Sequence, residues 1–147
     1  MWDEIERRVA DGGHMSGVAR SRERVDLTAE VFTPAPLVVK MLQDMPIEAF
    51  APGKTVLDPA CGDGNFLIAA KWVKVLEFGM SEVEALEDLY GVDIMRDNVD
   101  RARERLGGGT ILMGNTLEPS ARLEGQTEED HAMMLELFVS TSQEALF

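Results

Sequence analysis

Three polar residues each lie at the end of a short apolar segment of the sequence: Asp58, Asp93 and Asn115. A carboxylate can accept hydrogen bonds from both hydroxyls of a ribose, and an amide can donate to and accept from the edge of an adenine. The carboxyl ends of parallel strands meet at one edge of an open sheet, where ligands bind. We therefore expect one crevice in which Asp93 binds a ribose, Ile94 packs on an adenine face and Asn115 contacts the adenine edge.

A glycine-containing loop follows the first of these acids. Gly62 and Gly64 come shortly after Asp58, and an apolar helical pattern then opens at Phe66. Because glycine has no Cβ, the backbone of this loop can approach a ligand closely, and the free N–H groups of the helix start can bind it. The loop is not the dinucleotide-binding pattern G-x-G-x-x-G, because Leu67 stands at the third glycine position.

Strands that alternate with helices are expected to position these residues. Thr33 is a candidate N-cap for a helix whose first residue is Pro34, Gly79 is a candidate C-cap, and Ser81 opens a capping box for a short helix. The sequence predicts strands over 55–57, 89–93 and 110–113, and longer helices over 2–10, 34–45, 65–78 and 97–106. This alternation predicts a parallel, doubly wound α/β sheet.

The stretch 58–67, Asp-Pro-Ala-Cys-Gly-Asp-Gly-Asn-Phe-Leu, closely resembles the S-adenosylmethionine (SAM) loop of amino-group DNA methyltransferases. In the adenine-specific members whose SAM region precedes catalysis, a Phe/Tyr-Thr-Pro segment lies upstream, and residues 31–34 (Val-Phe-Thr-Pro) resemble it. The segment 90–94 (Tyr-Gly-Val-Asp-Ile) is similar to the one that carries the ribose acid, and 114–115 (Gly-Asn) to the third element. Order and approximate spacing agree across residues 22–117.

The resemblance to the N-terminal SAM-binding region of these enzymes has implications for fold and cofactor. It implies a Rossmann-like class I SAM-dependent methyltransferase fold (α/β) with a small or truncated parallel sheet and flanking helices. It implies SAM as cofactor and S-adenosylhomocysteine as product, and the chain as a whole resembles short phage-encoded methylase-like proteins. The implied cofactor-binding residues are Phe32, Thr33, Pro34, Asp58, Ala60, Cys61, Gly62, Asp63, Gly64, Phe66, Asp93, Ile94 and Asn115.

Cys61 is the single cysteine of the chain and allows two interpretations. Methylation of cytosine carbon-5 uses a Pro-Cys nucleophile, but Cys61 lies inside the cofactor loop and not in a separate catalytic loop. We therefore interpret Cys61 as a small packing residue. One cysteine and two distant histidines predict no metal site.

The catalytic motif of amino-group methyltransferases, (Asp/Asn/Ser)-Pro-Pro-aromatic after the fourth strand, has no counterpart in this sequence. The prolines are at 34, 36, 46, 52, 59 and 119, and no two are adjacent. If 135–139 forms a fourth strand, 140–143 (Ser-Thr-Ser-Gln) takes the place of the motif without a diproline or an aromatic ring. Residues 133–138 read equally well as a helix. The sequence therefore assigns no catalytic residue.

The charge of the chain argues against unaided DNA binding. Its net charge is −13, from 14 basic and 27 acidic residues, whereas DNA-binding domains are usually basic. The one basic cluster is 20–24, and the acidic segment 118–130 is expected to be mobile. We divide the chain into a helix and linker (1–19), a SAM-binding domain (20–117), and an acidic linker with a C-terminal helix or strand (118–147).

Two functions remain open from the sequence. The first is an adenine DNA methyltransferase, or its cofactor-binding part, that acts with another chain supplying catalysis and DNA contacts. The second is a SAM-binding protein that does not methylate, and instead sequesters or cleaves SAM or modulates a restriction-modification enzyme. A binder of another nucleotide is a third, weaker reading.

The remaining expectations concern assembly and location. A small sheet leaves an unpaired edge, so we expect a homodimer or a hetero-oligomer. The chain has no apolar run of about 20 residues and no signal-peptide core, so we expect no membrane association. A single cysteine fits the cytoplasm, that of a bacterial host if the protein is phage-encoded.

Overall fold

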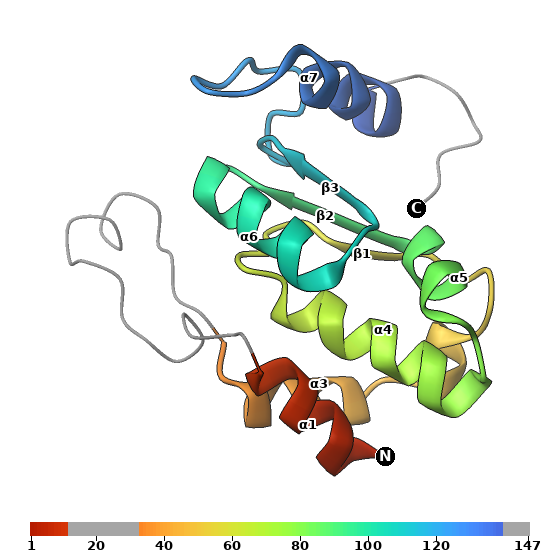
Figure 1. Ribbon diagram of the computed structural model, residues 1–147. Coiled ribbons are helices and arrows are strands. Elements are labelled where there is room, and N and C mark those ends of the chain that lie inside the picture. The colour runs from red at the N-terminus through yellow and green to blue at the C-terminus, as the bar shows by residue number, and fades with distance from the viewer. Residues whose placement is uncertain (12–32, 140–147) are drawn as a thin grey trace.

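A parallel sheet between helices forms the centre of the protein in the computed structural model, which describes residues 1–11 and 33–139 (Figure 1). The strands are β1 (Val56–Asp58), β2 (Leu89–Asp93) and β3 (Thr110–Met113), in the order β1-β2-β3. Both neighbouring pairs are parallel, with Leu57 opposite Tyr90 and Val92 opposite Leu112. The parallel α/β sheet expected from the sequence is thus confirmed. None of the helices in this part of the chain is long and apolar enough to cross a membrane.

Several sequence-based expectations lie outside the described residues. They concern Phe32, the basic cluster at 20–24, and the segment 140–143 that would follow a fourth strand.

Helices cover one face of the sheet in two layers. The helices α4 (Asn65–Phe78) and α6 (Arg96–Leu106) pack against the strands, and α1 (Trp2–Ala10) and α3 (Ala35–Gln43) pack against α4 (Figure 1). The main hydrophobic core lies between these layers. Its members include buried Ile5, Val38, Leu67, Val73 and Leu106. The expected helices at 2–10 and 65–78 are confirmed, and Gly79 is the C-cap of α4.

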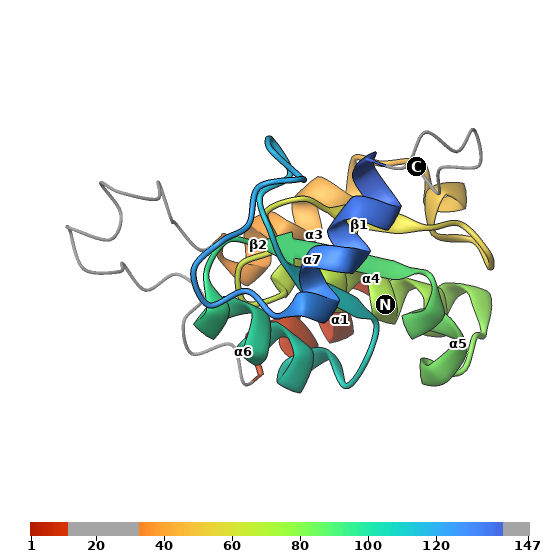
Figure 2. The ribbon, with the colours of Figure 1, turned by 90° about the horizontal axis from the view of Figure 1, so that it is seen from above.

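The helix α7 (Glu128–Met134) crosses the opposite face of the sheet and continues into a π-helical turn, η2 (Leu135–Val139) (Figure 2). Met134 is buried in a second, smaller core with Val92 and Leu112. Gly114 makes this packing possible, because a Cβ there would lie 2.6 Å from the Met134 sulfur. Residues 135–139 are therefore helical, and the alternative of a fourth strand is wrong.

The expectation of a mobile acidic segment at 118–130 is also wrong. Asp130 in α7 is buried, accepts a hydrogen bond from Met113 N at 3.0 Å and forms ion pairs with Arg96 and Arg103. Thr127 caps α7 by accepting from Asp130 N. In the sequence this segment resembles a solvated tail, but the fold supplies cationic and backbone partners for Asp130.

Two helix starts test the N-cap residues that the sequence predicts. Ser81 accepts a hydrogen bond from Glu84 N at 3.1 Å and caps α5 (Glu82–Glu87), as the capping box predicts. The predicted N-cap of α3 was wrong by one residue, because Pro34 and not Thr33 is the N-cap. Pro34 has an extended ψ of 151°, and its carbonyl accepts from Val38 N, so the helix begins one residue later.

A buried lysine ties together the elements at the amino ends of the strands. Lys74 of α4 has no exposed surface. Its amine donates to the carbonyl oxygens of Phe50, Ala51 and Lys54, at 2.8 to 3.3 Å. It also forms an ion pair of 2.8 Å with Asp88. Phe50 closes the 3₁₀ helix η1 (Ile47–Phe50), so this cluster fixes the approach to β1.

Candidate cofactor site

Asp93, at the carboxyl end of β2, organises the loops around it. Its Oδ2 accepts a hydrogen bond from Gly62 N at 3.0 Å, and its Oδ1 accepts from Met95 N at 2.8 Å and from Asn98 Nδ2 at 3.2 Å. Met95 and buried Asn98 are not among the site residues expected from the sequence, because nothing in their spacing marks them as partners of this acid. Both oxygens of the Asp93 carboxylate thus already accept hydrogen bonds from the chain. A ribose bound to Asp93 would share these oxygens with the backbone and with Asn98.

Asp58 ends the neighbouring strand, β1, and has fewer hydrogen-bond partners than Asp93. Its Oδ1 accepts one hydrogen bond, from Ala60 N at 3.2 Å. Burial raises the pKa of the Asp58 carboxyl, the Ala60 N–H opposes this, and the charge of Asp93 raises the pKa further. Within residues 1–11 and 33–139, Asp58 forms no ion pair. The carboxyl ends of β1 and β2 therefore bring two carboxylates to the same edge of the sheet.

The glycine loop between β1 and α4 depends on backbone angles that favour glycine. Gly62 has φ 55° and Gly64 has φ 98°, both in the left-handed region. Gly64 is the N-cap residue of α4, and Cys61 N donates to Val92 O at 2.8 Å, which fixes the loop over β2. The sequence prediction of a strand, a glycine turn and a helix start is confirmed.

Cys61 packs beneath this loop. It is 5% exposed, and burial raises the pKa of its thiol well above the usual value, with further contributions from Asp93 and Asp58. A Cβ at Gly91 would lie 3.1 Å from the Cys61 sulfur and 2.7 Å from Leu67 Cδ1, so the glycine of β2 admits this packing. The thiol stays protonated at neutral pH, which agrees with a packing role and not with a nucleophile.

Arg105 of α6 connects the glycine loop to the N-terminal helices. It donates to Asp63 O at 2.9 Å, Asn65 Oδ1 at 2.8 Å and Val9 O at 2.7 Å, and it lies 3.1 Å from Asp63 Oδ2. Asn65 in turn donates to Thr33 O at 2.8 Å. Asp63, which the resemblance places among the cofactor residues, is thus buried in an internal ion pair. The sequence gives no signal for this role of Arg105.

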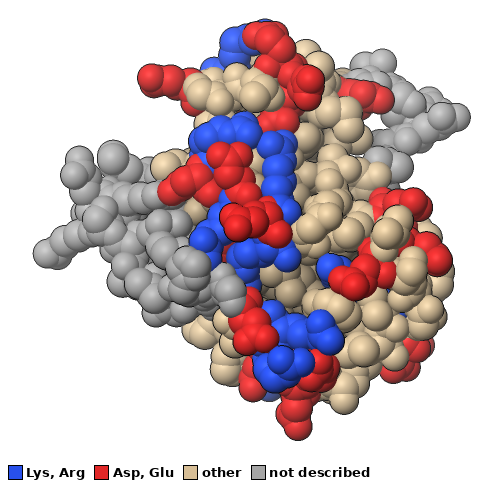
Figure 3. Space-filling model, viewed as in Figure 1, with Lys and Arg blue, Asp and Glu red and all other residues tan. Residues whose placement is uncertain are grey.

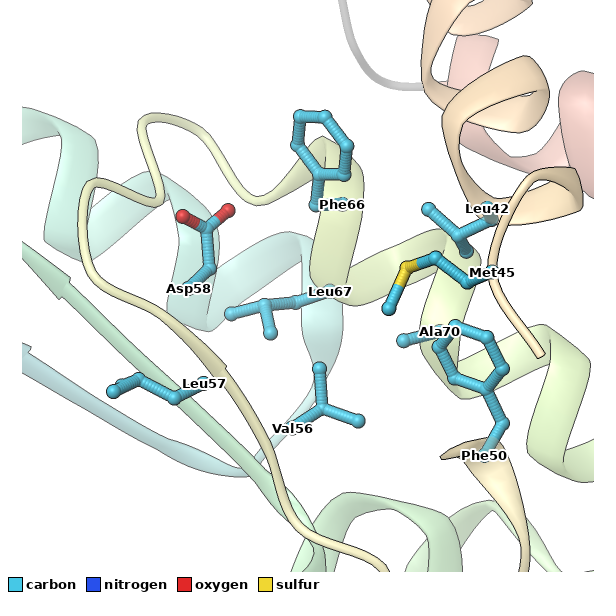
Figure 4. A pocket seen from close by; sticks show the side chains of 9 residues that line it. All are labelled: Leu42, Met45, Phe50, Val56, Leu57, Asp58, Phe66, Leu67 and Ala70. Atoms are coloured by element: carbon cyan, nitrogen blue, oxygen red, sulfur yellow. The ribbon is translucent and has the colours of Figure 1, made fainter. Parts of the chain in front are cut away.

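The other candidate residues follow strand ends or open α4. Asn115 follows β3, and its Oδ1 accepts from Leu117 N at 3.0 Å, which leaves its side chain in a local turn. Ile94 is 40% exposed and could cover a flat ring. Phe66, at the start of α4, lies with Asp58 at the end of an apolar pocket of about 210 Å³ (Figure 4). Among the described residues, no group of His, Cys, Asp and Glu could bind a metal ion.

Comparison with known protein families assigns the chain to one of them. The sequence model of the N-6 DNA methylase family matches residues 19–104, which include β1, the glycine loop, β2 and most of α6. The chain belongs to the N-6 DNA methylase family. No curated protein and no solved structure matches it.

The family assignment bears directly on fold and cofactor. The three-stranded sheet is a truncated form of the Rossmann-like methyltransferase fold. N-6 DNA methylases generally use SAM, and the residues at the strand ends fit it. SAM carries an ammonium, a sulfonium and a ribose diol, which match the carboxylates of Asp58 and Asp93, whereas these two acids would repel phosphate groups.

Several described arginines of this member of the N-6 DNA methylase family are paired with acids of the same chain. Figure 3 shows a band of Lys and Arg side chains interrupted by acids. Arg96 and Arg103 on α6 form ion pairs with Asp130, and Arg7 on α1 pairs with Glu4 and Asp11. These described arginines offer no uncompensated basic surface for a DNA backbone.

Proposed function

We propose that this chain is a SAM-binding subunit of an adenine DNA methyltransferase and that methyl transfer requires a partner chain. The observation that supports SAM binding is the pair of carboxylates at the ends of β1 and β2. Asp58 and Asp93 end adjacent strands beside a left-handed glycine loop that is hydrogen-bonded to Asp93. When bound, SAM supplies the methyl group. The residues of this chain bind and orient it, with the methionine end near Thr33, Pro34 and the glycine loop and the adenosine end near Asp93.

The need for a partner follows from the chemistry of the acceptor. The amine of adenine is a poor nucleophile because its lone pair is delocalised into the ring. A methylase must extrude the base, stack it on an aromatic ring and accept hydrogen bonds from the amine. The sequence has no Pro-Pro-aromatic segment for this purpose, and the paired arginines and net charge of −13 disfavour phosphate binding.

Calorimetric titration with SAM, S-adenosylhomocysteine and ATP tests the cofactor assignment. We expect heat with both sulfur-containing ligands and none with ATP, because the triphosphate would meet Asp58 and Asp93. Absence of heat at millimolar SAM would remove the cofactor assignment.

Transfer of a radiolabelled methyl group from SAM to DNA tests the second half of the proposal. The purified chain alone should transfer little or nothing, and addition of a partner with the missing loop and a basic groove should restore activity. Robust transfer by the lone chain, lost in Asp93→Ala, would show that it needs no partner.

The acidic charge also favours a second candidate, a SAM-binding protein that does not methylate DNA. Such a protein would sequester or cleave SAM or modulate a restriction-modification enzyme, as a short phage-encoded protein in a bacterial cytoplasm could. The same assay separates the two candidates, because no partner chain would then restore methyl transfer.

A further inference from the structure

The two edges of the sheet differ in how their backbone groups are bonded. Side chains bond to most of the outward backbone groups of β3. Arg103 Nε donates to Ile111 O at 3.0 Å, Met113 N donates to Asp130 Oδ2 at 3.0 Å, and Gln126 Nε2 donates to Met113 O at 2.7 Å. An edge bonded in this way cannot pair with another strand.

The edge of β1 is open. Val56 N donates to Asp88 O at 2.8 Å, so Val56 faces β2. The alternation along a strand then directs the N–H and C=O of Leu57 away from the sheet. In the described part of the chain, neither of these groups of Leu57 has a hydrogen-bond partner. In the described residues, three of the four outward backbone groups of Ile111 and Met113 in β3 thus have side-chain partners, whereas neither outward group of Leu57 in β1 has one.

The apolar pocket runs along this open edge. Figure 4 shows Leu42, Met45 and Phe50 on one side of it, facing side chains of β1 and α4. Met45 is 47% exposed although it lines the pocket. An open strand edge beside an apolar pocket is the arrangement that binds an added strand, because the backbone bonds give affinity and the pocket takes a side chain.

Charge and shape indicate what kind of strand fits. The chain has a net charge of −13, and Asp58 lines the pocket, so a basic segment is favoured over a second copy of this acidic chain. The rest of the pocket lining is apolar, so an apolar side chain of the added segment fits there.

We propose that the open edge of β1 binds an extended segment of another, basic polypeptide, with an apolar side chain of that segment in the pocket. This inference rests on the proposed need for a partner chain. In the parallel orientation, residues that follow the added strand would arrive beside Asp58, because parallel strands share their carboxyl edge. The partner would thus deliver its own loop to the candidate cofactor site.

Binding of a short synthetic peptide in which lysine and isoleucine alternate tests the proposal. Amide hydrogen exchange of the protein, followed by NMR, should show fast exchange at Leu57 in the free chain and at least roughly tenfold slower exchange when peptide is bound. A peptide with glutamate in place of lysine should bind more weakly, and a peptide with N-methylated backbone amides should not bind.

Matched variants separate the edge and pocket from general surface effects. Met45→Ser should weaken peptide binding about tenfold, since it removes apolar contact area in the pocket. Met41→Ser is the control, because Met41 is 45% exposed but does not line the pocket. Leu57→Pro removes the outward N–H while leaving the bonds to β2, and it should abolish binding in a chain that still melts cooperatively.

Peptide binding that leaves Leu57 unprotected, or equal effects of the two methionine variants, would overturn the proposal. So would a dimer of the free chain, seen by sedimentation, that Leu57→Pro dissociates, because a second copy would then occupy the edge. The peptide measurements need no SAM. Their failure with SAM binding intact would refute this inference alone, and peptide binding without SAM binding would refute the cofactor assignment alone.

Discussion

A charged side chain is buried at the amino ends of the strands and another is half-buried at the carboxyl ends, but the two have different partners. At the amino ends, Lys74 donates to three carbonyl oxygens and pairs with Asp88, which also accepts from Gly53 N at 3.0 Å. At the carboxyl ends, Asp58 accepts a single backbone hydrogen bond, and its pKa is raised chiefly by burial. Every donor of the Lys74 amine has an acceptor, whereas the Asp58 carboxylate has no cation beside it in the described residues.

The difference indicates which charges serve the fold and which serve a ligand. A buried charge with complete internal partners stabilises only the arrangement that provides them, and its loss leaves those partners unsatisfied. A partly buried carboxylate without a counterion raises the free energy of the empty protein, and such groups gather at functional sites. We therefore expect changes at the amino ends to affect stability and changes at the carboxyl ends to affect binding.

Lys74→Met should have the largest effect, a loss of about 3–5 kcal/mol in the free energy of unfolding, because Asp88 and three carbonyl groups lose their partner. Chemical denaturation followed by circular dichroism measures it. Lys54→Met is the control and should change little, since the Lys54 side chain is exposed and only its carbonyl contacts Lys74. Equal stability of the two variants would contradict a structural role for the Lys74 cluster.

Gly62→Val should abolish SAM binding while costing about 1–3 kcal/mol of stability through strain at φ 55°. The added branch would occupy space at the loop that the cofactor needs. Gly53→Val is matched in strain, with φ 80° in the turn before β1 and no atom within 4 Å of the added Cβ, and it should leave SAM affinity unchanged. Calorimetric titration of both variants with SAM measures the difference. A Gly62→Val protein that still binds SAM would exclude the loop from the site.

Asp93→Ala should weaken SAM binding by about 1.5 kcal/mol, the lower end of the range for charge-assisted hydrogen bonds, because the ribose would be partly solvated. Some stability should also be lost, since Gly62 N and Met95 N lose their acceptor. Asp100→Ala, an exposed acid paired with Arg96 on α6, is the control for net charge. If affinity is unchanged in a folded Asp93→Ala protein, the acid only organises the loops.

Asp58→Asn should have the smallest effect of these substitutions, and it should raise the stability of the protein instead of lowering it. The folded-state pKa of Asp58 lies above its unfolded value, so folding favours the protonated carboxyl, and stability is lost as pH rises through that pKa. The neutral amide lacks this penalty. Its melting temperature should exceed that of the wild type near pH 7, and the difference should vanish at acid pH, where both states are protonated.

Asp130→Asn is the comparison for that measurement. Asp130 pairs with Arg96 and Arg103, so its neutralisation should lower the melting temperature near pH 7. If Asp58→Asn is also destabilising at neutral pH, the contrast between partnered and unpartnered acids does not hold.

Local sequence signals were sufficient wherever neighbours along the chain decide the structure. The capping serine at Ser81, the glycine at Gly79 and the apolar runs of the strands act through nearby residues, and the corresponding elements formed as expected. The expectations failed where distant partners decide. The acidic segment packs on the sheet at Asp130, because Arg96 and Arg103 form ion pairs with the Asp130 carboxylate and Met113 N donates a hydrogen bond to it.

The sequence by itself determined the order of strands and helices, the glycine loop and the acids at the strand ends, because these depend on residue type and local spacing. Only the tertiary structure decided that Asp93 is bonded to the glycine loop and that Arg105 joins α6, α4 and α1. It also decided that side chains bond to most of the outward backbone groups of β3, while those of Leu57 in β1 have no partner in the described residues. Those contacts join residues that are far apart in the chain, and no periodicity or motif in one sequence encodes which of many charged residues will meet.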